Sequence, residues 1–543
     1  QQCWKLLGGT EAKWNYLTNS DELRAFWRTG IKRAKNWETI TTVGMRGDGD
    51  MAMPSAEDNQ ALLERIVADQ RQIIESVTHK PAHETPQVWA LYKEVQDYYD
   101  HGMQVPEDIT LMLCDDNWGN IRRVPTEENR YRKGGFGFYY HFDYVGDPRN
   151  SKWINISPIP RVWEQLNLAY EHGIRQIWIA NVGDLKPMEY PIQFFLDMAW
   201  NPQRFNASNL TQHTDSFCAS VFGQEYALEA SRLLRTYAKF NRRITPENLD
   251  AHTFSFAYNE WDRVVNDYNR LRDDARRLEA HLPDSLQSAY FELLGMPIEG
   301  VCNLYNMYYA QAKGWPTRVK ECYDYDSLLS VRYHQLENGK WNHLMDEVRI
   351  GYTYWQTPDH RSMPQVDSLS SVETVASPAT MAQGGYHSVE AEHFTRKQDG
   401  EKVQWTIIPE LGRTLSGLTT QPVTASVDGA WVEYDFTTDQ SDSARVIVRL
   451  APTLNYIPSG QRMAVQLDNQ QQVVNINGHY KGELGQWQKD HIIDICCSFA
   501  CPAGQHTLRL TPLDNGIVME KIMIDWGGLQ PSFLGPQETI NTS

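Results

Sequence analysis

The first two hundred residues alternate between short apolar runs and longer amphipathic segments. The segments between the runs repeat with a period near 3.6, as at residues 58–77 and 159–173. This rhythm predicts parallel strands joined by right-handed helical crossovers. Five strands are expected, at ITTVGM ending near Met45, QVWALYK near Ala90, ITLMLC near Met112, GFGFYYHF near Tyr139 and RQIWIANV near Ile179.

Polar side chains follow each of the five predicted strands. Because they occupy every carboxyl end, the pattern favours a (β/α)8 TIM barrel, whose site is assembled from many strand ends, over an open sheet with one crevice. The carboxylates of the third set could also simply cap a turn. In strand order the groups are Arg46, Asp48 and Asp50; Lys93 and Glu94; Asp115, Asp116 and Asn117; Tyr139, Tyr140, His141 and Asp143; and Asn181, Asp184 and Lys186.

The pattern changes twice further along the chain. From about residue 206 the apolar period is near 3.6, and one long face ends at Pro283. After the Ser-, Thr-, Ala- and Gly-rich residues 366–385, the period becomes two, as in WVEYDF, RVIVRL, MAVQLD, HTLRL and EKIMIDW. We therefore expect part of a TIM barrel with its last five strands at 1–205, an α-helical bundle at 206–365, a linker at 366–385 and an antiparallel β-sandwich at 386–543. Further bundle helices are expected at 226–240, 285–313 and 327–344.

Composition narrows the classes of partner. A formal net charge of -18 over 543 residues argues against nucleic acid or an anionic membrane surface. No apolar stretch is long enough for a membrane span. The eight cysteines lack zinc-site spacing, and no glycine-rich phosphate loop follows a strand, so neither metal nor nucleotide cofactor is expected. The 18 Trp and 27 Tyr suit a protein that stacks on sugar rings, although large cores use them too.

Four motifs together resemble a known family. TVGMRGDGD, LCDDNWGN, GFGFYYHFDYVGDPRNSKWIN and IWIANVGDLKPME are similar to glycoside hydrolase family 115, the xylan α-1,2-glucuronidases. The resemblance implies a barrel pocket for a glucuronic or 4-O-methylglucuronic acid branch. It implies glucuronoxylan or aldouronic oligosaccharides as substrates, free glucuronic acid as product, and a homodimer formed through the bundle and the sandwich.

The same resemblance bears on the start of the chain. Family members carry an N-terminal domain and the first barrel strands, with a TSHHEP-like motif, before the segment that matches Gln1. We therefore expect an upstream region to complete the barrel, since a barrel of five strands would expose unpaired edges. QQCWKLLGG begins without Met or a secretory leader, so the chain is expected to start inside a longer protein. Because xylan is extracellular, the parent protein is expected to be secreted or periplasmic.

Glycoside hydrolysis needs one carboxyl that protonates the leaving oxygen and one carboxylate that activates water or attacks carbon. We predict Glu94 as general acid and Asp50 as the carboxylate that positions water, with Asp115 a close competitor, and the family implies inversion. A uronate substrate also needs cations or fixed donors. The predicted substrate-binding residues are Arg46, Asn117, Tyr139, Tyr140, His141, Asn181 and Lys186.

Other interpretations stay open at this point. Glu94 could lie on the outer face of the amphipathic segment KEVQDYYDHG, and His141 could be a core histidine. A metal-dependent barrel hydrolase would use carboxylate and histidine ligands, but of the histidines only His141 is well placed. A non-catalytic carbohydrate-binding or scaffold protein is the remaining alternative.

Overall fold

The computed structural model describes most of the chain, in segments. These are residues 2–10, 13–47, 51–53, 58–147, 149–366, 385–440, 442–452, 456–457, 459–477 and 493–539. The chain divides into two compact units. One contains residues 1–115, 121–140 and 169–179, and the other contains residues 116–120, 141–168 and 180–543.

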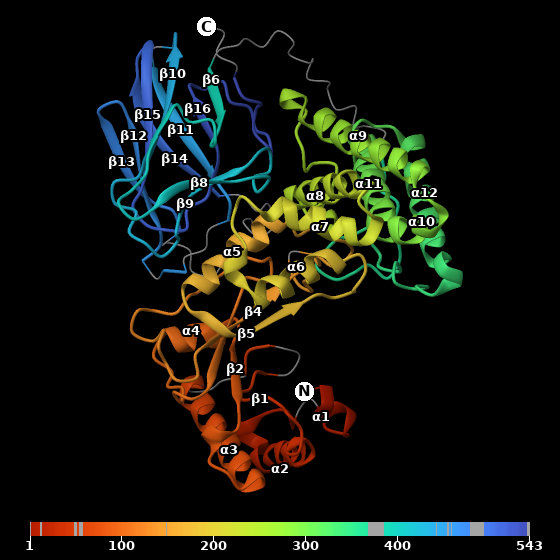
Figure 1. Ribbon diagram of the computed structural model, residues 1–543, viewed down its shortest axis with the longest axis vertical. Coiled ribbons are helices and arrows are strands. Elements are labelled where there is room, and N and C mark those ends of the chain that lie inside the picture. The colour runs from red at the N-terminus through yellow and green to blue at the C-terminus, as the bar shows by residue number, and fades with distance from the viewer. Residues whose placement is uncertain are drawn as a thin grey trace. The chain divides into compact units, whose positions relative to one another are not determined.

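The first unit is built on a sheet with the strand order β1-β2-β3-β4-β5 (Figure 1). The pairs β1–β2, β2–β3 and β3–β4 are parallel, with Val88 opposite Thr110 and Leu111 opposite Phe136. All five predicted strands are therefore confirmed, and they follow one another in the sheet as they do in the chain. Their bounds are β1 Thr41–Thr42, β2 Gln87–Leu91, β3 Thr110–Cys114, β4 Phe136–His141 and β5 Ile174–Asn181.

Helix α3 shows why the predicted crossovers form. The Asp58 side chain accepts hydrogen bonds from two N–H groups of the first turn, and the helix ends where His79 takes the left-handed conformation at φ 58°. Its apolar face, which includes Leu63 and Ile66, is buried. Helix α2 packs against α3 and was not predicted (Figure 1). The helices before β3 are α1 Gln2–Leu6, α2 Tyr16–Ala34, α3 Asn59–Thr78 and α4 Glu94–Asp100.

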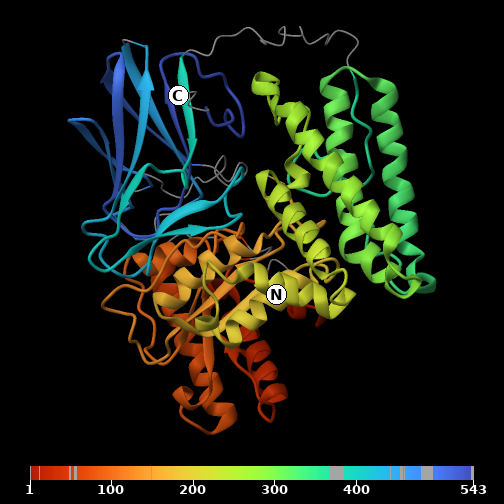
Figure 2. The same ribbon diagram turned by 45° about the horizontal axis from the view of Figure 1, so that its top comes forward.

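Helix α5 lies between β4 and β5 in the chain, and a long helical region follows β5. Helix α9 has the predicted buried face, which includes Trp261, Tyr268 and Leu278, and it ends just before Pro283 as expected. Helices α11 and α12 lie side by side (Figure 2). The bounds are α5 Ile159–Glu171, α6 Glu189–Trp200, α7 Leu210–Phe222, α8 Ala227–Arg243, α9 Glu260–His281, α10 Asp284–Tyr290, α11 Met296–Ala312 and α12 Pro316–His334.

Two of the helix predictions need adjustment. The helix expected at 327–344 occupies Pro316–His334 instead, because Pro316 supplies the fixed φ of a first helical turn. After this helix, Glu337 and Asn338 have positive φ values of 49° and 57°, which end the helical run. The single helix expected at 285–313 is α10 followed by α11, joined by a π-helical turn at Phe291–Gly295.

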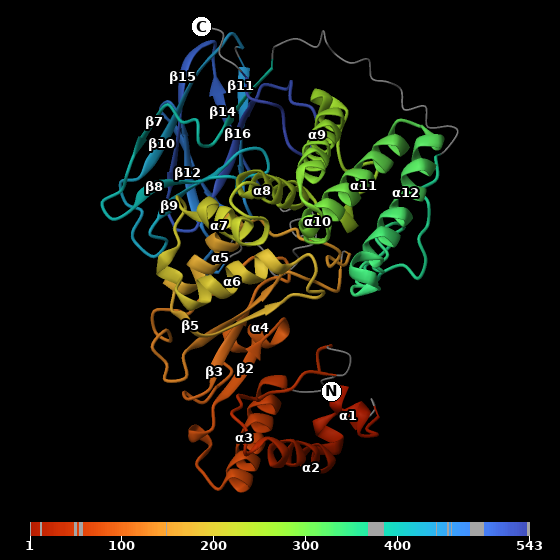
Figure 3. The ribbon, with the colours of Figure 1, turned by 45° about the vertical axis from the view of Figure 1, so that its right-hand side comes forward.

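The C-terminal region consists of two antiparallel sheets, as the period-two pattern predicted (Figure 3). One has the order β13-β12-β15-β10-β7, and the other has the order β14-β11-β16-β9-β8 with β6 also on β16. The apolar faces form one core that includes Val432, Val446 and Leu508. The bounds are β6 Tyr386–Glu390, β7 Arg396–Gln398, β8 Gln404–Ile408, β9 Gly417–Gln421, β10 Trp431–Thr438, β11 Asp442–Leu450, β12 Arg462–Leu467, β13 Gln470–Asn475, β14 Ile493–Cys501, β15 Gly504–Pro512 and β16 Met519–Asp525.

The architecture is thus multidomain, with a parallel α/β region, a helical region and a sandwich-like pair of antiparallel sheets. The predicted linker falls almost wholly on residues 367–384, which lie outside the described residues. Within the described segments, none of the helices combines the length and the apolar character that crossing a bilayer demands.

Candidate active site

In the first unit, the structure brings Arg46 and Glu94 together. The guanidinium donates two parallel hydrogen bonds, from Nε to Oε1 at 3.0 Å and from Nη2 to Oε2 at 2.7 Å. Arg46 follows β1, and its guanidinium carbon lies 5.1 Å from the centroid of the Tyr92 ring. Bidentate pairs of this kind fix the carboxylate plane as well as its position. Glu94 is therefore held in one orientation.

The backbone before Glu94 explains how the carboxylate is presented. Lys93 has a φ of 48°, in the left-handed region that most residues avoid, and Glu94 is the first residue of α4. The chain thus turns sharply between β2 and the helix. The Glu94 side chain is 21% exposed and the Arg46 side chain 15%. The pair is shielded, yet solvent or a ligand can reach it.

Asp115 and the two tyrosines lie on the neighbouring strands. The Asp115 N–H donates to the Tyr139 carbonyl at 3.3 Å, and Asp115 also forms an antiparallel bridge with Ile121. Asp115 and Tyr140 are buried, whereas Tyr139 is half-buried. Side chains alternate along β4, so Tyr140 shares a face with Phe138, whose ring centroid is 5.8 Å away.

In the second unit, residues 116–120 form a tight loop organised by Asp116. Its Oδ1 accepts the N–H groups of Trp118 at 2.9 Å and Asn120 at 3.0 Å, and its Oδ2 accepts the Asn120 side-chain amide at 2.9 Å. Asp116 therefore caps this turn, which is the alternative role that the sequence left open for the carboxylates here. Asn117 sits at the tip with a φ of 72°, and its side chain hydrogen-bonds Tyr144.

The ends of β4 and β5 are tied together around Asp143 and Asn181. The Asn181 carbonyl accepts the N–H groups of Phe142 and Asp143 at 2.8 and 3.3 Å, and the Asn181 side-chain amide donates to the Asp143 carbonyl at 3.2 Å. Gly183 lies directly on the Asp143 carboxyl, because a Cβ there would stand 2.6 Å from Cγ. Only glycine lets the two segments approach this closely.

The carboxyl of Asp143, just beyond the end of β4, has a raised pKa. Burial raises the pKa of its carboxyl to about 6, with Asp184 and Glu347 adding to the rise, while Lys152 and His141 oppose it. Its Oδ1 is buried and has no hydrogen-bond partner among the described residues. His141, two residues earlier, is 9% exposed. Asp143 was among the strand-end residues but not among the predicted site residues, because its burial is invisible in the sequence.

Lys186 is surrounded by charges and an aromatic ring. Its ammonium lies 2.5 Å from Glu189 Oε1, 3.4 Å from Glu292 Oε2 and 4.5 Å from the centroid of the Trp341 ring. Burial and the neighbouring Glu189 raise the pKa of Glu292 well above its usual range. The sequence contained no signal for this cluster, since Glu292 and Trp341 come from the helical region.

Two further observations limit the candidate chemistry. Asp48 and Asp50 lie outside the described residues, so the structure does not place the predicted water-positioning carboxylate. Among the described residues, no group of three His, Cys, Asp or Glu side chains has a geometry that could hold a metal ion. The described cysteines from Cys114 to Cys501 are unpaired thiols, and all but Cys496 are buried.

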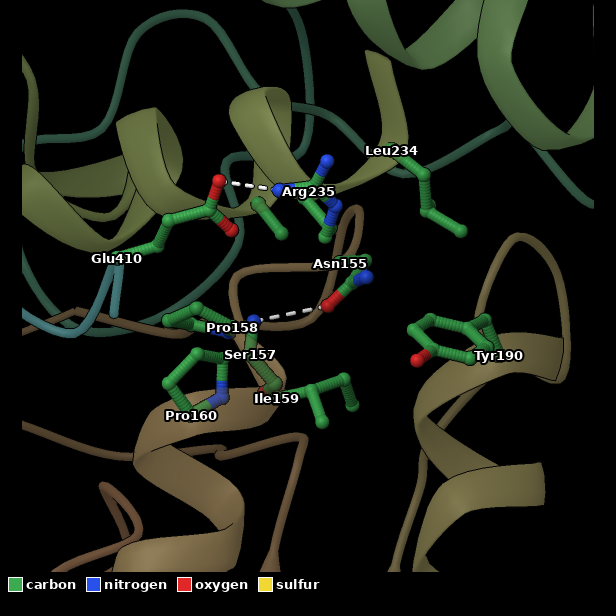
Figure 4. A pocket seen from close by; sticks show the side chains of 10 residues that line it. Asn155, Ser157, Pro158, Ile159, Pro160, Tyr190, Leu234, Arg235 and Glu410 are labelled. Carbon is green, nitrogen blue, oxygen red and sulfur yellow. Dashed lines mark hydrogen bonds and ion pairs between the residues drawn. The ribbon is translucent and has the colours of Figure 1, made fainter. Parts of the chain in front are cut away.

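A pocket beside the N-terminus of α5 is too small for a sugar (Figure 4). Its volume is about 10 Å³, which is room for one water molecule. Asn155 accepts a hydrogen bond from the Ser157 N–H, and Arg235 forms an ion pair with Glu410 on the opposite side. We assign this pocket to packing between the helices and the sandwich within the second unit.

Two family models match the chain. The model of glycosyl hydrolase family 115 matches residues 1–248, and the model of that family's C-terminal domain matches residues 381–538. A solved family 115 4-O-methyl-α-glucuronidase with specificity for decorated arabinogalactans is 27% identical, with a TM-score of 0.80, over 94% of this chain and 67% of that chain. A search of curated proteins found no match.

Two other solved structures show weaker similarity. A family 138 glycoside hydrolase that targets pectin rhamnogalacturonan II is 11% identical over 93% of this chain and 70% of its own, with a TM-score of 0.40. The C-terminal CBM6 of a marine laminarinase from Zobellia galactanivorans is 16% identical over 26% of this chain and 98% of its own, with a TM-score of 0.19.

Proposed function

Because the chain belongs to glycoside hydrolase family 115, we propose that it is an α-glucuronidase that removes (4-O-methyl)glucuronic acid side chains from a polysaccharide. The observation that carries this proposal is the family match over residues 1–248, which includes the Arg46–Glu94 pair and Asp115. The similarity to a solved 4-O-methyl-α-glucuronidase supports the same activity.

We propose Glu94 as the general acid. Its carboxyl would give a proton to the leaving glycosidic oxygen, which leaves a carboxylate behind. The two hydrogen bonds from Arg46 would then stabilise that new charge and hold the group for the next cycle. Asp50 or Asp115 would activate the attacking water, and inversion would require about 6.5–9.5 Å between acid and base.

The substrate carboxylate needs its own donors. Arg46 already contacts Glu94, and Lys186 already contacts Glu189 and Glu292. The cations predicted from the sequence to meet the uronate are Arg46, His141 and Lys186. The amides of Asn117 and Asn181 and the hydroxyls of Tyr139 and Tyr140 remain the predicted contacts for sugar hydroxyls.

The polymer to which the uronic acid is attached is a separate proposal. The family resemblance of the sequence motifs implies glucuronoxylan or aldouronic oligosaccharides, while the similar solved enzyme is specific for decorated arabinogalactans. We propose glucuronoxylan as the first substrate to test. We also propose that the parallel sheet is the C-terminal part of a (β/α)8 barrel completed by an upstream region, and that the protein is secreted or periplasmic and dimerises through its bundle and sandwich.

The activity is tested by incubating the protein with glucuronoxylan and with arabinogalactan that carries 4-O-methylglucuronic acid. We expect free uronic acid from at least one of them, and NMR during the first turnovers should show the β anomer, since inversion converts the α linkage. The polymer that yields uronic acid identifies the preferred backbone. Retention of both polymers on the protein without release would instead indicate a carbohydrate-binding or scaffold protein.

The role of Glu94 is tested separately with the Glu94→Gln variant on two substrates. An aryl glucuronide has a good leaving group that needs little protonation, whereas a xylo-oligosaccharide branch needs a proton donor. We expect the variant to lose about 10²–10⁴-fold in kcat on the oligosaccharide and far less on the aryl glucuronide. Equal losses on both substrates would argue against proton donation by Glu94.

A further inference from the structure

The sandwich in the second unit carries an open, polar hollow. Its volume is about 560 Å³, which lies within the range of roughly 300–1,000 Å³ that small-molecule sites occupy. It lies over β10 and β15, which pair side by side (Figure 1), beside β7 and the turn between β12 and β13. The residues that line it include Arg396, Asp435, Thr437, Asp468, Gln505 and Thr507.

The strand register brings four polar side chains of the hollow together. Thr437 is paired with Gln505, and Asp435 is paired with Thr507, across β10 and β15. Residues two positions apart on a strand share a face, so the four side chains lie on the same face of the sheet. Phe436, which lies between two of them on β10, is buried and points to the core instead. The hollow therefore has a polar floor on a rigid sheet.

Two of the four side chains are available to a ligand. The Gln505 amide and the Thr437 hydroxyl are exposed, and neither side chain is hydrogen-bonded to another group in the part of the chain that the structure describes. Each of these groups can both donate and accept a hydrogen bond. Because the two residues are directly opposite each other, their polar atoms can meet neighbouring groups of one ligand.

The two carboxylates at the hollow are held in fixed orientations. Arg396 donates to Asp435 Oδ1 at 2.8 Å and to Oδ2 at 2.5 Å, and the Thr507 hydroxyl donates to Asp435 Oδ1 at 2.7 Å. Asp468 Oδ1 accepts the Thr507 N–H at 3.0 Å. The Asp435 and Asp468 side chains are nevertheless 39% and 37% exposed. A carboxylate can accept about four hydrogen bonds, so both groups keep acceptor capacity for a ligand.

The charges at the hollow favour an uncharged ligand. Arg396 contacts Glu433 at 2.8 Å as well as Asp435, and His506 Nδ1 lies 2.8 Å from Asp468 Oδ2. The basic residues that line the hollow are thus already paired with carboxylates, which leaves little attraction for an anion. The described residues also form no group of three ligands for a metal ion. A neutral molecule rich in hydroxyl groups matches the amide, the hydroxyl and the carboxylates best.

We propose that this hollow binds the uncharged sugar backbone of the polysaccharide from which the protein removes uronic acids. The identity of the ligand rests on the proposed function, whereas the site itself rests on the geometry of the sandwich. Adjacent sugar hydroxyls can donate to the carboxylates and exchange hydrogen bonds with Gln505 and Thr437. Free uronic acid is negatively charged, so Asp435 and Asp468 would repel it. The site would therefore hold the polymer and not the product.

Calorimetric titration of the full chain with oligosaccharides that carry no uronic acid tests the proposal. Unbranched xylo-oligosaccharides and unbranched galacto-oligosaccharides are the two probes, and they distinguish the two candidate backbones. We expect one of them to bind with a Kd on the order of 1 mM, since hydrogen bonds exposed to water contribute little each. Free glucuronic acid at the same concentration should not displace it. Absence of binding by both probes would overturn the proposal.

Two double variants locate the binding. Thr437→Ala combined with Gln505→Ala removes both available groups without breaking a side-chain hydrogen bond of the fold, and it should weaken binding by about tenfold. Thr424→Ala combined with Gln404→Ala is the matched control, because both residues are exposed on the sandwich and do not line the hollow. The control should bind as the wild type does. Equal affinity of the two double variants would show that the sugar binds elsewhere.

The sugar site and the proposed function can fail separately. Release of glucuronic acid from an aryl glucuronide requires no sugar backbone, so it measures the activity of the wild type independently of the hollow. An active protein that binds neither unbranched probe would overturn the sugar site and leave the proposed function standing. An inactive protein whose binding of a probe is lost with Thr437→Ala and Gln505→Ala would keep the site and overturn the proposed function.

Discussion

The Arg46–Glu94 and Arg349–Asp326 pairs have the same chemistry and very different surroundings. In each, the shortest contact between the guanidinium and the carboxylate is 2.7 Å. The first pair lies at the strand ends of the parallel sheet, and its side chains are 15% and 21% exposed. The second lies in the helical region at 2% and 3% exposed. Access to solvent is what separates the two.

The buried pair is sealed by further contacts. Asp326 also accepts a hydrogen bond from Arg361 at 3.0 Å, and the Arg349 guanidinium lies 4.6 Å from the centroid of the Trp153 ring. No ligand can exchange with these partners. The Arg46–Glu94 pair keeps a face open, so its carboxyl can meet a substrate. We therefore expect the accessible pair to serve the proposed catalysis and the sealed pair to serve stability.

The largest effect is expected at the accessible pair. Glu94→Gln should lower kcat on a glucuronic acid-decorated substrate by about 10²–10⁴-fold, because it removes the proposed proton donor. Tm should change by less than about 2 °C, since partly exposed pairs contribute little to stability. Initial rates of uronic acid release and thermal unfolding measure the two quantities. A fully active Glu94→Gln variant would contradict the proposed link between the accessible pair and catalysis.

The sealed pair should behave in the opposite way. Asp326→Asn leaves Arg349 buried without its charged partner, so we expect the free energy of unfolding to fall by about 3–5 kcal/mol. Urea denaturation measures this change. The kcat of the folded fraction should remain within about twofold of the wild type. A loss of stability below about 1 kcal/mol would mean that burial does not distinguish the two pairs.

Glu247 is a buried carboxyl group without a cationic partner in these hydrogen bonds. Its Oε1 accepts them from the backbone N–H groups of Lys152 and Trp153 at 2.8 and 3.0 Å. Burial raises the pKa of Glu247 to about 7. In the folded state the carboxyl therefore keeps its proton to a higher pH than in the unfolded state. Its contribution to stability is full below about pH 4.5 and is lost as the pH rises through 7.

Glu247→Gln removes this titration. The variant should lack a pH-dependent component on the order of 3 kcal/mol in the free energy of unfolding between pH 4.5 and 7. Denaturation midpoints at several pH values measure it. Glu401→Gln is the control, since Glu401 is exposed, and its pH profile should match the wild type. Parallel profiles for Glu247→Gln and the wild type would contradict the prediction.

The smallest effect is expected on the outer face of the sandwich. Arg396 bonds Glu433 and Asp435 with short contacts, but its side chain is 48% exposed. Arg396→Met should cost less than about 1 kcal/mol, because water competes for both partners. Urea denaturation of the full chain measures it. A cost comparable to that of Asp326→Asn would show that geometry, and not burial, sets the strength of these pairs.

Much of the fold was predictable because local periodicity reports it. The five strands, the helices α3, α5 and α9 and several strands of the sandwich follow directly from apolar spacing. Apolar spacing alone predicts a later start for α12, because it does not register that Pro316 can begin a helix. Helix α2 was missed because its exposed, charged face hides the apolar positions.

The site was predictable only as a set of residue types. The strand-end pattern marked Arg46 and Glu94, but their mutual contact requires β1 and β2 to be neighbours. Asp143 lacked a distinguishing signal, since the burial that raises its pKa depends on Gly183 and on packing from distant segments. The charges around Lys186 were equally hidden, because Glu292 is more than one hundred residues away in the chain.

By itself, the sequence determined which segments become strands or helices and which family the chain resembles, because periodicity and motifs are local properties. Only the tertiary structure decided which charged side chains contact one another and how far each remains exposed to solvent. Arg46 and Arg349 are the same residue type, and their neighbours in the chain do not show how deeply each guanidinium is buried. Folding buries Arg349 and leaves Arg46 accessible, and the free energy of a charge depends on that difference in solvation.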